Sequence, residues 1–448
     1  MEDRKLKGDL TYGKVWKVIL AFVFPLLLGN LLQQTYHVVD SIIVGRFIGK
    51  EALAAVSASF FIYYFIISLV IGIGSGITVI VSQCYGGRQY EKVQAAFSSF
   101  FIFTFIAGVF LAIIGILFSE TFFFLMKTPE DVIPEAVRYF RVYMCGTPFF
   151  VIFNSFLSVM RGMGDSKRPM ALVLFTAVLN IIFDLLFIVI FEWDIEGVAF
   201  ATVLAQGTGV LMAVVYVHKR HPLLSMKRKD MKFDRRLFFH GMKIGIPTSV
   251  QQCSLSLGLL ALLSIVNLSG TDTLTAYGVA GKIDSLITQV ILTLSSAMSA
   301  FCGQHIGAGN VLRIRQGVRF AMFINILFSV GVYIIICIFG REIMAAFTTD
   351  EVVISTGYDY LLIVGAVFIL HGAMNVMNGA MRGAGDTLFA MITGIVLFWI
   401  IRVPLAYVLS EYMGYKGIWL AISISLTAGF VATYIYYKSE RWKHRKIV

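Results

Sequence analysis

The sequence contains few charged residues and few cysteines. Charged residues make up 14% of the 448 positions and hydrophobic residues 58%, whereas soluble domains average about 25% charged and about 45–50% apolar residues. This composition excludes an ordinary water-soluble fold. The five cysteines include no C-x-x-C pair, which argues against a structural metal site or a disulfide framework. No G-x-x-x-x-G-K-[ST] sequence occurs, so we expect no phosphate-binding loop for ATP.

The chain has instead a series of apolar stretches, each long enough to cross a bilayer, which takes about 20 residues. They predict an all-α polytopic membrane protein with twelve transmembrane helices. The predicted spans are residues 18–45, 53–81, 95–118, 137–159, 169–191, 197–217, 237–267, 276–301, 318–340, 357–380, 388–410 and 417–437.

The net charge of +11 reflects how basic residues are distributed between loops, and it does not indicate a nucleic-acid partner. Lys and Arg concentrate near both chain ends and in the connection 219–243, whereas the loops on the opposite side contain few. Such an asymmetry in short loops predicts that both termini are cytoplasmic. We therefore expect a multi-pass protein of the inner membrane, with the lipid bilayer as its surroundings.

A repeat divides the chain into two halves. The sequence M-R-G-M-G-D at 160–165 recurs as M-R-G-A-G-D at 381–386, and Pro25 and Pro247 occupy matched places in the first span of each half. The predicted domains are an N-terminal lobe (1–218), a cytoplasmic linker (219–236) and a C-terminal lobe (237–448), related as a parallel repeat of six helices each. Duplicated lobes are typical of carriers that move a substrate between two bodies.

Two features of the repeat allow two interpretations each. A proline inside a helix bends it, and the bend is either fixed or changes during transport. The R-G-x-G-D loops place Arg161 with Asp165, and Arg382 with Asp386, at the cytoplasmic mouth of each lobe. These loops either close the mouth or hold helices together.

Three helices of the first lobe carry polar residues at one depth. Asp40, Asp184 and Thr202 lie about 9, 12 and 8 Å from the outer ends of their helices, at 1.5 Å per residue. Asn180 lies one turn from Asp184 on the same face. Further pocket or substrate candidates are Gln34, Tyr36, His37, Asn154 and Gln206.

The oxygen-bearing side chains of Asp40, Asn180, Asp184 and Thr202 suit a hard cation such as Na⁺, which prefers oxygen ligands. Two close carboxylates in a poorly hydrated place can alternatively share and carry a proton. Either cation would change the charge of the pocket and bias two conformations. The structural alternative is a buried hydrogen-bond network that only holds the three helices together.

The second lobe lacks this acidic set, because Asp40 aligns with Leu262 and Asp184 with Leu405 or Pro404. The polar residues within its helices are Lys282, Asp284, His371, Asn375 and Arg402. We expect Asp284 and Arg402 to form an ion pair between helices, with either a structural or a substrate-related role.

Several motifs together resemble the multidrug and toxic compound extrusion (MATE) transporters over the whole chain. They are the two R-G-x-G-D turns, the sequence G-Q-H-I-G-A-G at 303–309 with its counterpart S-Q-C-Y-G-G at 82–87, and R-V-P-L-A-Y at 402–407. The resemblance implies two six-helix lobes around a central cavity and export of amphipathic, often cationic, compounds in exchange for H⁺ or Na⁺. In the branch with its cation site in the N-terminal lobe, that site corresponds to Asp40, Asn180, Asp184 and Thr202.

The predicted function is therefore a cation-coupled antiporter, driven by H⁺ or Na⁺, that exports amphipathic drugs or toxic organic compounds by alternating access. We expect no enzymatic activity, no cofactor, and a monomer. The alternative is a flippase for a lipid-linked oligosaccharide or cell-wall precursor. Its cavity would need several Arg and Lys for a pyrophosphate, whereas the only basic residues expected within helices are Lys282 and Arg402.

Overall fold

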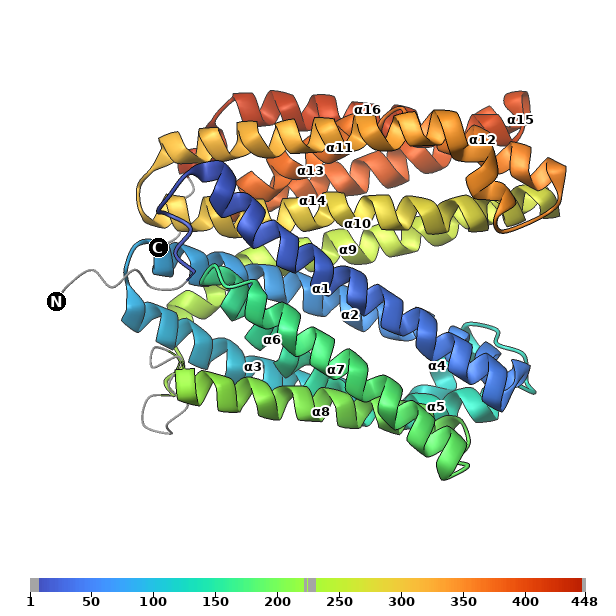
Figure 1. The fold of residues 1–448 in the computed structure, drawn as a ribbon, viewed down its shortest axis with the longest axis horizontal. Coiled ribbons are helices and arrows are strands. Elements are labelled where there is room, and N and C mark those ends of the chain that lie inside the picture. The colour runs from blue at the N-terminus through green and yellow to red at the C-terminus, as the bar shows by residue number, and fades with distance from the viewer. Residues whose placement is uncertain (1–7, 221–223, 225–230, 445–448) are drawn as a thin grey trace. The chain divides into compact units, whose positions relative to one another are not determined.

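The computed structural model describes residues 8–220, 224 and 231–444, and within its helices the side chains of 36–38, 50, 51, 61, 220 and 444 are not described. The described residues form helices and connections without a strand, as Figure 1 shows. The predicted all-α class is confirmed.

The helices of the first half are α1 (Val15–Ile43), the π-helical turn η1 (Val44–Ile48), α2 (Lys50–Gly86), α3 (Tyr90–Leu117), α4 (Ser119–Leu125), α5 (Ile133–Cys145), α6 (Thr147–Gly162), α7 (Lys167–Leu185), the π-helical turn η2 (Leu186–Ile190) and α8 (Ile195–Arg220). Those of the second half are α9 (Arg235–Leu268), α10 (Thr271–Gly307), α11 (Val311–Ala345), α12 (Glu351–Gly365), α13 (Phe368–Gly383), α14 (Leu388–Ile395), the π-helical η4 (Val396–Arg402), α15 (Val403–Met413), α16 (Tyr415–Lys438) and the 3₁₀ turn η5 (Arg441–His444).

Among the described residues, ten helical segments are long and apolar enough to span a membrane, and two bent helix pairs bring the number to twelve. The twelve predicted spans are thus confirmed, with a correction to two of them. Spans 137–159 and 357–380 are not straight: α5 and α6 meet at 47°, and α12 and α13 at 48°. At the first bend, Pro148 follows Gly146 in sequence; proline has no N–H to continue the helical hydrogen bonds, and this favours a break.

The repeat is visible in the boundaries of the helices. α2 and α10 begin and end 221 residues apart, and so do α6 and α13. The two bent pairs therefore occur at corresponding places in the two halves. The three π-helical segments do not follow this correspondence. η1 has no counterpart in α9, and η4 begins nearer the start of its membrane span than η2 does.

The contacts divide the chain into two compact units. Unit 1 contains Met1–Asp9 and Phe24–Gly245, and unit 2 contains Leu10–Val23 and Ile246–Val448. The predicted lobe boundaries at 218 and 237 stay a prediction. The contacts add that α1 starts in unit 2 and α9 starts in unit 1, and that each helix changes unit just before its proline, Pro25 or Pro247.

Each starting segment is held by specific bonds within its unit. In unit 2, the Leu10 N–H donates to Gln304 Oε1 at 2.9 Å, and the Arg313 guanidinium donates to the Gly13 carbonyl at 2.7 Å. In unit 1, the Asp234 N–H donates to Ser99 Oγ at 2.7 Å. These bonds show that both helix starts are integral parts of the units they join.

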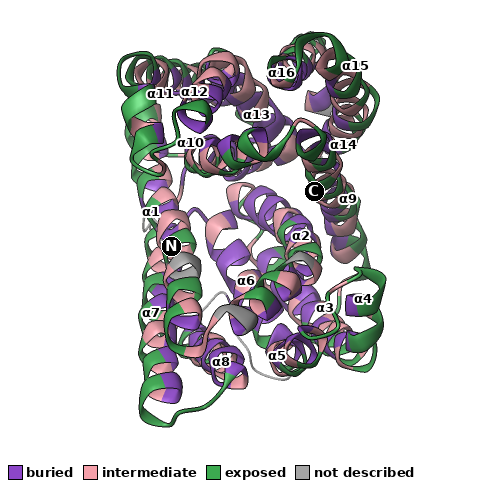
Figure 2. Cartoon of the chain, turned by 90° about the vertical axis from the view of Figure 1, so that its right-hand side faces the viewer, coloured by how far each residue is buried: buried purple, intermediate pink, exposed green. Residues whose placement is uncertain are grey.

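The outer helices present apolar side chains where a soluble protein would present charge. In unit 2, α11 and the helix formed by α14 and α15 are largely exposed (Figure 2), whereas the C-terminal half of α10 is mostly buried. Ile334, Ile335 and Ile338 of α11 are all more than half exposed. Water does not favour such a surface, but lipid tails do.

Candidate cation site and neighbouring pocket

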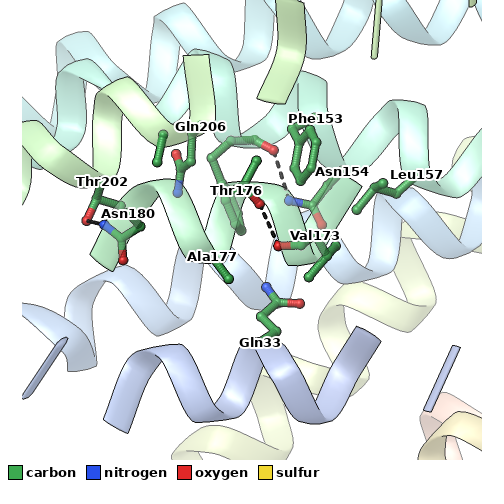
Figure 3. A pocket seen from close by; sticks show the side chains of 12 residues that line it. Gln33, Phe153, Asn154, Leu157, Val173, Thr176, Ala177, Asn180, Thr202 and Gln206 are labelled. Atoms are coloured by element: carbon green, nitrogen blue, oxygen red, sulfur yellow. Dashed lines mark hydrogen bonds between the residues drawn. The ribbon is translucent and has the colours of Figure 1, made fainter. Parts of the chain in front are cut away.

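Three helices of unit 1 bring the predicted cation residues together. Asp40 lies near the end of α1, Asn180 and Asp184 lie one turn apart on α7, and Thr202 lies on α8. The Asn180 side-chain N–H donates to Thr202 Oγ1 at 3.2 Å, as Figure 3 shows. Asp184 is 0% exposed, Asn180 2% and Thr202 6%. The four residues form one buried polar cluster, which is called the acid cluster below.

The acid cluster contains more acceptors than donors. The carboxyl groups of Asp40 and Asp184 lie within hydrogen-bonding reach of each other. Neither group can donate when both are ionised. Four buried oxygens have no donor among the described residues: Asp40 Oδ1, both carboxyl oxygens of Asp184, and Asn180 Oδ1.

The chemical consequence is a demand for positive charge. Two adjacent carboxylates shielded from water cannot both remain ionised without a large desolvation and repulsion cost. A proton shared by the pair, or a cation held by the free oxygens, removes that cost. The cluster therefore has the composition of a cation site, and Asn180 and Thr202 supply its neutral oxygens.

Both acid-bearing helices change their winding close to the acid. α1 becomes π-helical at Val44, four residues after Asp40, and α7 becomes π-helical at Leu186, two residues after Asp184. The two π-helical turns, η1 and η2, pack against each other, and η1 also packs against α8. π-helical turns occur frequently at functional sites. No feature of the hydrophobic pattern predicts these turns.

A small pocket lies next to the acid cluster in unit 1 (Figure 3). Its polar lining comes from Gln33, Asn154, Thr176 and Gln206, together with Asn180 and Thr202 of the cluster. The cavity volume is about 40 Å³, which is room for a few waters. Drug-sized ligands need about 300–1,000 Å³, so this pocket does not enclose one.

The pocket includes some of the predicted residues and not others. Asn154 and Gln206 line it, and the Asn154 amide also donates to the Phe150 carbonyl at 2.9 Å. Gln34 lies outside this pocket: it is exposed, and its neighbour Gln33 lines the pocket. The substrate role of Gln34 stays a prediction. Adjacent helical residues point about 100° apart, so only one of the two can face α6 and α7.

Tyr36 and His37, which the sequence suggested as pocket or substrate residues, have side chains that lie outside the described residues.

The polar residues of unit 2 do not form the ion pair expected from the sequence. Asp284 and Arg402 interact electrostatically but make no direct contact. The Arg402 Nε instead donates to Ser425 Oγ at 2.7 Å, and its guanidinium lies 4.4 Å from the centre of the Phe398 ring. The π-helical η4 ends at Arg402, and its wider turns place this side chain differently from the straight helix assumed for the prediction.

The other predicted residues of unit 2 also remain separate. Lys282 is exposed on α10, and His371 is half-buried on α13. The Asn375 amide donates to the backbone carbonyl of His371 at 2.9 Å. No group of three or more His, Cys, Asp or Glu residues that could hold a metal ion occurs among the residues that the structure describes.

Two repeats of six spans, with a buried acid cluster in one of them, define a membrane carrier with a duplicated architecture. The MatE family model matches residues 25–186 and again residues 247–408, one match in each repeat. This chain belongs to the MATE family of membrane transporters.

Similar proteins agree with this assignment over nearly the full length. The chain is 33% identical over 442 residues to the probable multidrug resistance protein YoeA of Bacillus subtilis (strain 168), covering 97% of this chain and 95% of that protein. It is 30% identical over 440 residues to the probable multidrug resistance protein YpnP of the same organism, covering 98% of each. A solved outward-facing multidrug resistance MATE transporter superposes with a TM-score of 0.91 at 24% identity, covering 98% of both chains. That likeness supports the two-lobed fold with twelve helices.

Proposed function

We propose that this chain exports amphipathic, often cationic, organic compounds in exchange for H⁺ or Na⁺. In this proposal the protein acts as a monomer in the inner membrane, with both termini in the cytoplasm, and works by alternating access. The single observation that carries the coupling role is the excess of acceptors in the acid cluster, where four buried oxygens have no donor among the side chains that the structure describes. The names of the relatives YoeA and YpnP support multidrug export.

Cation binding provides the drive in this cycle. A cation that enters from outside is attracted to Asp40 and Asp184 and removes one negative charge from the cluster. Moving one charge down the membrane potential releases about 2.3 kcal/mol per 100 mV. That energy supports a substantial outward gradient of substrate, because about 1.4 kcal/mol corresponds to a tenfold concentration ratio.

Shared residues connect the cation to the pocket. Asn180 and Thr202 belong to the acid cluster and also line the pocket. A cation that recruits the Thr202 hydroxyl oxygen competes with the hydrogen bond that this oxygen accepts from the Asn180 side-chain N–H. The polar lining seen by a substrate therefore differs between the cation-bound and cation-free states, as a coupled carrier requires.

The test is substrate export from energised vesicles in which pH and Na⁺ gradients are imposed separately. We expect Asp40→Asn and Asp184→Asn to abolish gradient-driven export. Asp284→Asn is the matched control, since it removes an acid within a helix of unit 2 and should leave the ion dependence unchanged. Export by both unit 1 variants with the ion dependence of the wild type would refute the coupling role. Binding of a lipid pyrophosphate without drug export would instead indicate a flippase.

A further inference from the structure

The R-G-x-G-D motif occurs once in each repeat. Its glycines and aspartates stabilise the fold, whereas its arginines do not. In each copy, a glycine with positive φ (Gly164 at 82°, Gly385 at 98°) closes the end of a helix. The Asp165 N–H donates to the Met160 carbonyl, and the Asp386 N–H donates to the Met381 carbonyl. These backbone bonds cap the last turns of α6 and α13 in the manner of a Schellman motif.

The aspartates of the motif are also engaged. Asp165 accepts hydrogen bonds from the side chain and backbone of Arg168, at 2.6 and 3.3 Å, and so fixes the start of α7. Asp386 accepts from the Tyr436 hydroxyl at 2.6 Å and so connects α13 to α16. The aspartates are therefore the residues that hold helices together, as one interpretation of the sequence expected.

The arginines have no such partner. Arg161 and Arg382 are half-buried in the last turns of α6 and α13. The Nε of each is shielded from solvent and meets no acceptor. No ion pair or hydrogen bond joins either guanidinium to any residue that the structure describes. The negative end of the helix dipole favours a cation here, but it cannot replace hydrogen-bond acceptors for a shielded guanidinium.

Both arginines sit on rigid supports. The adjacent Gly162 lies against the backbone of α2, where an added Cβ would come within 2.8 Å of the Thr78 carbonyl oxygen. Gly383 lies in the same way against α10, where an added Cβ would come within 2.9 Å of the Gly303 nitrogen. These tight contacts fix the backbone from which each guanidinium projects. A planar, unpaired guanidinium on a fixed backbone is suited to a group with two oxygens, such as a carboxylate or a phosphate.

We propose that Arg161 and Arg382 are equivalent oxyanion-binding residues, one in each repeat, that each take a phosphate or carboxylate group. The group belongs either to an anionic lipid headgroup or to a soluble compound. Its approach from the cytoplasm rests on the proposed topology, whereas the binding itself does not. A binding assay without transport therefore separates failure of this inference from failure of the antiport proposal.

The test uses full-length protein in an uncharged detergent, with thermal unfolding followed by tryptophan fluorescence. The probes are phosphatidylglycerol against phosphatidylcholine with the same acyl chains, and sodium phosphate against sodium chloride at equal ionic strength. We expect an oxyanion probe to raise the apparent melting temperature of the wild type. Loss of the charged hydrogen bonds in the Arg161→Gln/Arg382→Gln variant should raise the half-saturating concentration about tenfold or more. A response to phosphatidylglycerol alone identifies a lipid headgroup, and a response to phosphate identifies a soluble anion.

Two controls keep the test decisive. Arg315→Gln removes a charge from an arginine that is already paired with Glu440 at 2.9 Å, so it should leave the probe response unchanged. Without probe, the double variant should be at least as stable as the wild type, because it loses an unpaired charge. The proposal is overturned if neither probe stabilises the wild type, if the double variant responds like the wild type, or if it is destabilised without probe.

Discussion

Replacing Asp184 with Asn should stabilise the resting protein while it removes cation binding. Substitution of a fully buried acid usually destabilises a protein. Here, however, both carboxyl oxygens of Asp184 lack a donor, and the neighbouring Asp40 Oδ1 lacks one too. An Asn side chain supplies an N–H that can donate to the Asp40 carboxylate, and it leaves a single negative charge in the cluster.

The expected size follows from the new bond. A hydrogen bond to a charged group contributes about 1.5–3 kcal/mol. For a chain of 448 residues, an unfolding entropy of about 2.1 cal/mol/K per residue means that roughly 1 kcal/mol shifts the midpoint by about one degree. The apparent melting temperature should therefore rise by about 2–3 °C. The same substitution should abolish any stabilisation of the wild type by Na⁺ or by lowered pH.

The assay is thermal unfolding in detergent at pH 8 without Na⁺, followed by titration with Na⁺ at constant ionic strength and by a separate pH series. Asp359→Asn is the control, because Asp359 accepts from Lys416 Nζ and from the Tyr415 hydroxyl, both at 3.0 Å. Loss of these partners should lower the melting temperature of the control. A drop of similar size in Asp184→Asn would show that Asp184 already has donors, and the argument from excess acceptors would fail.

Three further predictions concern packing, the pocket and the C-terminus. Gly76→Ala should lower the apparent melting temperature, because its Cβ would meet the backbone of α9, whereas Gly278→Ala, with nothing within 4 Å, should not; overpacking costs about 1–3 kcal/mol. Thr202→Val removes the hydroxyl bonded to Asn180 and should weaken the response to the coupling cation more than it changes thermal stability; equal effects in both assays would contradict this. A hydrogen bond from a nearby lysine lowers the pKa of Glu440, so its stabilising effect exists at neutral pH and is lost as the pH falls through that lowered pKa. The difference in melting temperature between wild type and Glu440→Gln should accordingly be present at pH 7 and disappear once the pH falls below the lowered pKa of Glu440.

The hydrophobic pattern and the repeat predicted the twelve spans because apolar length is a property of the sequence alone. They could not predict the bends before α6 and α13, since apolar residues continue through both. Helical spacing along the chain brought Asn180 and Asp184 to one face, and depth counting placed Asp40 at their level. The same counting failed for Arg402, because a π-helical segment changes the number of residues per turn. Counting along the helix also could not decide which of Gln33 and Gln34 lines the pocket, because their side chains differ only in the direction in which they point from α1.

The repeat preserves the helix caps and close helix contacts of the two units, but it does not preserve the acid cluster. The R-G-x-G-D caps and the close glycine contacts occur in both units, whereas Asp40 corresponds to Leu262, which is only 1% exposed and part of an apolar core. A buried leucine cannot hold a cation, so under the proposed function the acid cluster of unit 1 is the coupling site and this place in unit 2 is not. A Leu262→Asp variant should therefore lose stability through an unpaired buried charge and should not gain a second coupled cation. A higher ion-to-substrate stoichiometry in vesicles than in the wild type would refute this.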